Sequence, residues 1–225
     1  MEPAGNLSTW QKIIRADNTR KSRFHDQRGN MVDPAGLIYL PHAYLTSALK
    51  RLGYRPTVPW ISYRARRELG RLIRPDWHVV EFGSGGSTAW LATRCGSIHS
   101  IESNPAWFAI VEKRLAKAHK NIRYELRDPS NYADLSDYAD GSVDFALVDG
   151  DVRGECVVNA LRTIKAGGFV YLDNSDWAIN PNSQEARGER SLVAAVKERG
   201  GKICYFVDFA PSLGAPSQGM LVRLD

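Results

Sequence analysis

Apolar positions beyond about residue 60 fall into short continuous runs separated by amphipathic stretches. The runs are rich in branched and aromatic residues, which favours buried strands at His78–Phe82, Ser97–Ile101, Ile122–Leu126, Val143–Val148 and Gly168–Leu172. Between them, Ala106–His119 repeats apolar residues at helical spacing, and a helix is expected around Glu155–Lys165, closed by Gly167 and Gly168. Strands that alternate with helices predict an α/β fold with a doubly wound, mostly parallel sheet.

The first strand runs directly into a glycine-rich turn, EFGSGGST. Gly83, Gly85 and Gly86 let the backbone turn sharply and approach a ligand closely, and Ser87 or Thr88 can cap the helix that follows. Such a turn cradles a nucleotide-like ligand at a helix N-terminus. Because Thr88 stands where a dinucleotide motif has its third glycine, an ordinary tight turn is the alternative interpretation.

Carboxylates stand at the ends of the expected strands. Glu81 ends the first strand, where a carboxylate repels a pyrophosphate and attracts a cationic nucleoside such as S-adenosylmethionine. Glu102 ends the second strand, where it can accept hydrogen bonds from both ribose hydroxyls. Because ligands bind beyond the carboxyl ends of parallel strands, one edge is expected to carry the acidic groups Glu81, Glu102, Asp128, Asp149 and Asp173.

The chain resembles the class I S-adenosylmethionine-dependent methyltransferases in five segments that occur in the family's order: VVEFGSGGST, SIESNPAW, YELRD, VDFALVDGD and GGFVYLDNSD. The end of the chain, Lys202–Leu224, is similar to the family's closing antiparallel hairpin. This resemblance implies a seven-stranded Rossmann-like sheet and an S-adenosylmethionine site, with the methionine part at the glycine turn and the adenine near Asp128. The expected cofactor-binding residues are Glu81, Gly83, Ser84, Gly85, Ser87, Thr88, Glu102, Ser103, Asp128 and Asp149.

Two carboxylates and an amide stand at the tips of two strands that are expected to be adjacent. Asp149, Asp173 and Asn174 offer the oxygens that a hard divalent cation such as Mg²⁺ prefers. Such a cation would lower the pKa of an acceptor hydroxyl and fix its direction. The pattern resembles the metal ligands of catechol and caffeoyl-coenzyme A O-methyltransferases. Those enzymes carry a catalytic lysine just after the first aspartate, whereas this chain has Val152 and Arg153 there.

A metal-free interpretation stays equally open. Asp149 would then shape the methionine end of the site, and Asp173 or Asp151 would remove the acceptor's proton. His42 is a further candidate base, although a lone histidine among aromatic residues more often only packs. The polar segment Ser175–Arg190 is expected to be a long loop at the ligand edge, with Trp177 a candidate wall for the substrate.

The basic character of the chain is concentrated in its N-terminal third. The net charge is +5 and the isoelectric point about 9.1, and up to Pro75 there are 14 Lys and Arg against 5 Asp and Glu. In the amphipathic helix expected over Ser62–Arg74, one face carries Arg64, Arg67, Arg71 and Arg74. A solvated helix face accounts for this stripe, and a docking surface for an anionic partner is the alternative.

Residues 1–60 are expected to form an extension that covers the substrate, with about the first 30 too polar to order alone, and residues 61–225 the methyltransferase domain. Cys95, Cys156 and Cys204 lack the spacing of a disulfide framework or zinc site. With neither a signal core nor a membrane-spanning apolar run, a soluble cytoplasmic protein is expected, alone or as a homodimer.

These features favour a transferase that methylates a hydroxyl of a small molecule or glycan. An RNA or other nucleic-acid methyltransferase that uses the basic N-terminal region is the first alternative. It is disfavoured because Asp149-Gly150-Asp151 differs from the D-P-P-Y type of amino-group DNA methyltransferases. A non-catalytic protein that binds a nucleotide cofactor is the second alternative, and Glu81 argues against a nicotinamide dehydrogenase.

Overall fold

A seven-stranded sheet in the order β3-β2-β1-β4-β5-β7-β6 forms the centre of the molecule. In the computed structural model, which describes residues 19–115 and 120–225, the first five strands are parallel, and β7 is antiparallel to both β5 and β6. The doubly wound sheet with a closing antiparallel hairpin is thus confirmed. The strands are β1 (His78–Phe82), β2 (Ser97–Glu102), β3 (Ile122–Leu126), β4 (Val143–Val148), β5 (Ile164–Leu172), β6 (Gly201–Asp208) and β7 (Ser217–Leu224).

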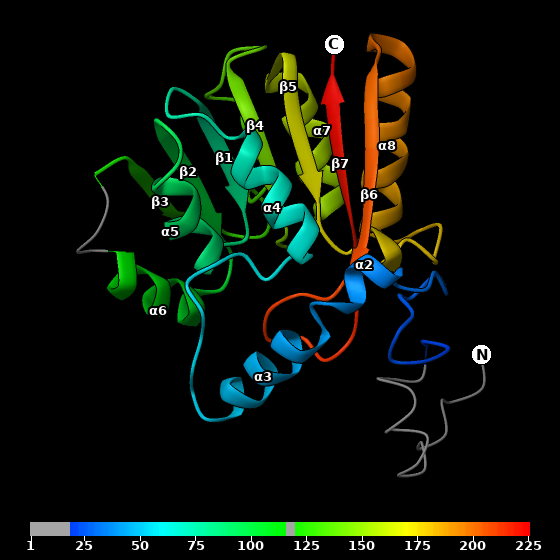
Figure 1. The fold of residues 1–225 in the computed structure, drawn as a ribbon. Coiled ribbons are helices and arrows are strands. Elements are labelled where there is room, and N and C mark those ends of the chain that lie inside the picture. Colours follow the sequence, from blue (N-terminus) through cyan, green and yellow to red (C-terminus); the bar gives the residue numbers. More distant parts are fainter. Residues whose placement is uncertain (1–18, 116–119) are drawn as a thin grey trace.

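Helices cover both faces of the sheet (Figure 1). On one face α4 (Tyr63–Leu72) and α5 (Gly86–Ala92) pack against strand residues such as Val79 and Leu147. On the other, α7 (Arg153–Thr163) and α8 (Gln184–Arg199) pack against Val80 and Val148. Neighbouring residues of one strand therefore serve opposite cores, as the pleat requires. The remaining helix of this layer arrangement, α6 (Pro105–Leu115), follows β2 and lies beside β2 and β3.

The N-terminal part of the chain lies beyond the carboxyl ends of the parallel strands (Figure 1). It contains α2 (Pro34–Leu37) and α3 (Leu40–Arg51), and it shares a small core with the residue that follows β6, Phe209. The Thr46 hydroxyl accepts a hydrogen bond from the Ser212 N–H at 2.9 Å, and the Tyr63 N–H donates to the Phe209 carbonyl at 3.0 Å. The extension is thus attached to the C-terminal hairpin.

Residues 19–30 make defined contacts with the rest of the chain. The Gln27 N–H donates to Asp176 at 3.0 Å, Arg28 pairs with Glu189, and Asp26 is fully buried. About the first 30 residues were expected not to order alone. Of these, residues 1–18 lie outside the described residues. The last four residues of the helix expected up to His119 lie outside them too.

Two boundaries differ from the expectation. The helix α7 does not reach Gly167; it ends at Thr163, because Ile164 is already extended and buried as the partner of Val143 in β5. The expected loop Ser175–Arg190 is mostly helical. A short 3-10 helix, η1 (Ser175–Trp177), starts it, and α8 begins at Gln184, where the Ser183 hydroxyl caps the Ala186 N–H at 3.1 Å.

The basic helix is present as α4, but its arginines do not share one open face. Arg64 pairs with Asp33 at 2.7 Å and with the buried Asp208 at 3.5 Å, and only 21% of its side chain is exposed. It therefore joins α4 to the extension and to β6. Arg74 lies beyond the helix end at Leu72. Within residues 19–115 and 120–225, no helix is both long and apolar enough to cross a membrane.

Candidate active site

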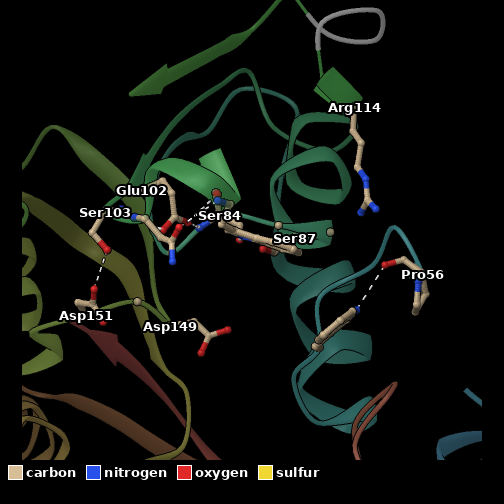
Figure 2. Close-up of a pocket in the computed structure, with 15 residues that line it drawn as sticks. Pro56, Ser84, Ser87, Glu102, Ser103, Arg114, Asp149 and Asp151 are labelled. Carbon is tan, nitrogen blue, oxygen red and sulfur yellow. Dashed lines mark hydrogen bonds between the residues drawn. The ribbon is translucent and has the colours of Figure 1, made fainter. Parts of the chain in front are cut away.

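A cavity of about 350 Å³ opens at the carboxyl ends of β1, β2 and β4. Figure 2 shows its carboxylates on one side, Glu102 and Asp151, with Asp149 below them and Ser87, Pro56 and Arg114 across the space. Its lining consists of Pro56, Trp60, Gly83, Ser84, Gly85, Gly86, Ser87, Glu102, Ser103, Asn104, Trp107, Arg114, Asp149, Gly150 and Asp151. The cavity thus brings together most of the residues expected to bind the cofactor.

Two glycines of the turn, Gly83 and Gly86, are required by close backbone packing. Gly83 has a φ of 94°, and a Cβ there would lie 2.7 Å from the Gly150 amide nitrogen. A Cβ on Gly86 would lie 2.6 Å from the Val58 carbonyl oxygen. Residues 54–60, called the cover segment from here on, are therefore packed directly on the glycine turn.

Thr88 explains why the third glycine of a dinucleotide motif is absent. It is fully buried, its hydroxyl accepts from the Gly85 N–H at 3.0 Å and donates to Glu81 at 2.6 Å. Gly85 is the N-cap residue of helix α5. Thr88, in the first turn, accepts the hydrogen bond from the N-cap backbone with its side chain. Neither Ser87 nor Thr88 is the N-cap residue itself.

Glu81 lies beneath the turn and does not line the cavity. One carboxylate oxygen accepts from the Thr88 and Ser100 hydroxyls at 2.6 and 2.5 Å, and the other, Oε1, is buried with no hydrogen-bond partner. Burial raises the pKa of Glu81 to about 7, against the smaller effect of the hydroxyl donors. An unpartnered acceptor below the turn suits a positive charge bound above it.

Glu102 is held by backbone and hydroxyl donors at the end of β2. One of its oxygens accepts from the Ser84 N–H and hydroxyl at 3.0 and 2.8 Å, and the other from the Ser103 and Asn104 N–H groups at 3.0 and 2.9 Å. The side chain is 6% exposed, so its direction is fixed before any ligand binds. Ser103 also donates to Asp151 at 2.6 Å, which links the ends of β2 and β4.

Aromatic residues and cations border the opposite side of the cavity. The Trp107 indole donates to the Ser84 carbonyl at 2.8 Å and lies beside the glycine turn. The Arg55 guanidinium lies 5.5 Å from the Trp107 ring centroid, and the Lys50 ammonium lies 4.5 Å from that of Trp60. Arg55 and Lys50 thus contact two side chains of the lining, and the lining itself contains Arg114.

A guanidinium joins the tips of β4 and β5. Arg153 donates to the Gly150 carbonyl at 3.0 Å, to the Asp173 carbonyl at 2.7 Å and to the Asn174 amide oxygen at 2.9 Å. It also donates to the Asp149 carbonyl and carboxylate, both at 3.1 Å. Burial raises the pKa of Asp149, partly offset by Arg153, and raises that of Asp173 well above its ordinary value, with the neighbouring Asp149 adding to the effect.

The four candidate bases do not all lie at the cavity. Asp149 and Asp151 line the cavity, whereas Asp173 is 3% exposed and accepts from the Tyr171 hydroxyl at 3.1 Å. His42 does not line the cavity; its Nδ1 lies 2.6 Å from the Tyr63 hydroxyl.

Two further candidates stay outside the lining. Asp128 is exposed at the end of β3 and Trp177 is 49% exposed. Sequence reasoning did not single out Asn104, Trp107 or Arg114. Asn104 and Trp107 follow directly on the acidic strand end Glu102, and that proximity was the available signal.

The predicted metal ligands do not fit a divalent cation in this arrangement. Asp149 and Asn174 give side-chain oxygens to Arg153, and the Asp173 carboxylate is bonded to Tyr171. The donor set is instead arranged around a guanidinium.

A scan of protein-family models finds no match, and neither does a search of curated proteins. Solved structures do resemble the chain. An O-methyltransferase from Bacillus cereus in complex with SAH is 15% identical with a TM-score of 0.61, over 84% of this chain and 91% of that one. An rRNA methylase from Streptococcus thermophilus is 15% identical with a TM-score of 0.56, over 76% of this chain and 97% of that one.

A tRNA methyltransferase from Aquifex aeolicus is 16% identical with a TM-score of 0.52, over 80% of this chain and 76% of that one. At such identities the likeness shows the fold alone. The chain has the class I S-adenosylmethionine-dependent methyltransferase fold, which its strand order also shows. Proteins with this fold that are named as O-methyltransferases and as rRNA or tRNA methyltransferases are both similar to it, so the acceptor has to be argued from the site.

Proposed function

We propose that this chain is an S-adenosylmethionine-dependent O-methyltransferase that acts on a hydroxyl of a small molecule or glycan. One observation carries the proposal: the glycine turn, the Glu102 carboxylate and the Asp149–Asp151 loop meet around a single cavity at the carboxyl edge of a class I sheet. A ligand in that space would meet carboxylates and backbone N–H groups, which suits a cationic nucleoside. We expect the enzyme to work in the cytoplasm.

The residues that would hold the cofactor follow from the cavity. Glu102 would bind the ribose hydroxyls, and Ser87 with the glycine turn would bind the methionine part. The buried Glu81 carboxylate would place negative charge below that part. When bound, S-adenosylmethionine supplies a methyl group made electrophilic by its sulfonium. Asp128 is not among the lining residues, so a role at the adenine would require that β3 end to approach the ligand.

In the transfer itself the acceptor oxygen forms the new O–C bond, the methyl C–S bond breaks, and the hydroxyl proton must pass to a base. Of the candidate bases, Asp149 and Asp151 open to the cavity. We assign the proton to Asp149, because a third of its side chain, 33%, is exposed there while Arg153 fixes its orientation. Asp173 would act through its contact with Asp149, and His42 has no place in this step.

The cover segment supports a small acceptor. Pro56 and Trp60 line the cavity, and Figure 2 shows Pro56 across the space from the carboxylates. A flat aromatic wall of this kind favours a ring or sugar face over a duplex backbone. Arg64 is also withdrawn from the basic stripe into ion pairs within the chain, which weakens the argument for a nucleic-acid surface.

Calorimetry on the full chain tests the cofactor part of the proposal. S-adenosylmethionine and S-adenosylhomocysteine should each bind in one-to-one stoichiometry, and NAD should not bind. Binding of NAD without binding of either S-adenosyl ligand would contradict the proposal.

The acceptor part needs a separate assay. Transfer of a tritiated methyl group should be detected with a panel of phenols and hydroxylated glycans and not with bulk tRNA or rRNA. Labelled RNA in the absence of any labelled small acceptor would make the chain a nucleic-acid methyltransferase.

A further inference from the structure

Arg153 has no donor left for a ligand. It is the first residue of α7, and its side chain is 11% exposed between the tips of β4 and β5. A guanidinium carries five N–H donors, and the five hydrogen bonds described above use each of them once. All five acceptors come from the β4 and β5 ends or from Asn174 directly after them. The group is therefore held in one position and one orientation.

All three residues predicted as metal ligands contact this guanidinium, two through their side chains and one through its main chain. Asp149 and Asn174 each give it a side-chain oxygen, and Asp173 gives it a backbone carbonyl. Mg²⁺ would need the side-chain oxygens of all three residues, together with several waters of its own. The Asp149 and Asn174 oxygens already accept from Arg153, and the Asp173 carboxylate accepts from Tyr171. A divalent cation would therefore meet a partly occupied donor set and the repulsion of the guanidinium charge.

We propose that Arg153 takes the place of a divalent cation in this site, so that the Asp149–Asp173–Asn174 cluster binds no metal and Arg153 acts as the positioning residue for Asp149. The planar fork fixes the carboxylate in direction, as a cation would. It leaves no open coordination position, so the acceptor must meet Asp149 itself. A metal can hold two neighbouring oxygens of a catechol, whereas here an acceptor with one isolated hydroxyl is sufficient.

The positioning role rests on the proposed methyl transfer. Metal binding, however, is measured without cofactor or acceptor, so the two proposals can fail separately. The probe is Mn²⁺, whose free form is followed by electron paramagnetic resonance during titration of the full chain. Three proteins are compared: wild type, Arg153→Met and Arg162→Met. Arg162 is the matched control, because it lies on the same helix and also donates to main-chain carbonyls, those of Leu135 and Tyr138, outside the cavity lining.

Wild type and Arg162→Met should leave the Mn²⁺ signal unchanged. Arg153→Met should remove about one equivalent of free Mn²⁺, because the Asp149 and Asn174 side-chain oxygens are then free beside the Asp173 carboxylate and the positive charge is gone. Adding Asp149→Asn to Arg153→Met should return the signal to the free value. A variant with merely damaged packing would not gain a stoichiometric site that depends on Asp149.

Stoichiometric Mn²⁺ binding by wild type that Asp149→Asn abolishes would overturn the proposal. A folded Arg153→Met protein that binds no Mn²⁺ would overturn the claim that the guanidinium excludes the ion. If circular dichroism shows that Arg153→Met does not fold, a measurement on the wild-type protein still tests the proposal. The affinity of the wild-type protein for S-adenosylhomocysteine should be equal in EDTA and in Mg²⁺. An affinity that requires Mg²⁺ would refute the proposal that Arg153 takes the place of a divalent cation.

Discussion

Replacing Glu102 by glutamine gives the sharpest test of the cofactor site, because the change keeps the shape of the side chain and removes only its charge and half of its acceptors. Each carboxylate oxygen accepts two hydrogen bonds, from Ser84 on one side and from Ser103 and Asn104 on the other. A glutamine amide has one oxygen, so its NH₂ group must face two donors whichever way it is turned.

The expected loss follows from that mismatch. Charge-assisted hydrogen bonds are worth about 1.5–3 kcal/mol each, so a ribose held by the carboxylate should bind about 10- to 150-fold more weakly. The misfit with the buried donors should also lower the free energy of unfolding by roughly 1–3 kcal/mol, since the side chain is 6% exposed.

Isothermal calorimetry with S-adenosylhomocysteine measures the first effect and urea unfolding the second. Glu198→Gln, at an exposed position of α8, is the matched control and should change neither. A folded Glu102→Gln protein with wild-type affinity would refute the assignment of Glu102 to the ribose, and with it the main support for the orientation of the cofactor in the cavity.

Three other changes test separate parts of the structure. Burial raises the pKa of Glu81 to about 7 from 4.5, so the folded protein keeps a proton that the unfolded chain releases, and stability should fall as pH rises through this window. The free energy of unfolding, measured by urea unfolding, should fall by up to about 3 kcal/mol less in Glu81→Gln than in wild type between pH 4.5 and 8. An unchanged dependence of the free energy of unfolding on pH would contradict this prediction. Gly86→Ala should displace the cover segment and weaken S-adenosylhomocysteine binding, whereas Gly214→Ala, whose added Cβ has ordinary contacts, should not. The pair Arg67→Gln and Arg71→Gln should leave cofactor affinity unchanged in calorimetry, and salt-sensitive tRNA binding that disappears in the pair would revive the nucleic-acid alternative.

The sheet could be predicted well because its signal is local. The parallel strands are short segments rich in branched and aromatic residues, and the bounds of β1, β3 and β4 agree with the sequence pattern to the residue. The acidic strand ends followed from the same pattern, since a parallel sheet places all its carboxyl ends at one edge. Glu102 and Asp149 accordingly line one cavity.

Contacts between distant segments could not be predicted in this way. The start of α8 lies in a polar stretch whose composition is typical of a loop, and Ser183 becomes a cap only once the helix packs on the sheet. Gly86 is required by Val58, nearly thirty positions earlier, rather than by the turn itself. Arg153 departs from the lysine of the catechol-type enzymes, but its five acceptors become visible only when the β4 and β5 ends meet.

The attachment of the extension to the C-terminal hairpin has a consequence for biosynthesis. Thr46 and Tyr63 leave the ribosome early, yet their partners Ser212 and Phe209 are among the last residues to be made. During translation the extension therefore cannot make these contacts until the end of the chain has been made. The contacts that hold the extension at the carboxyl edge of the sheet thus depend on the part of the chain that is made after β6 ends at Asp208.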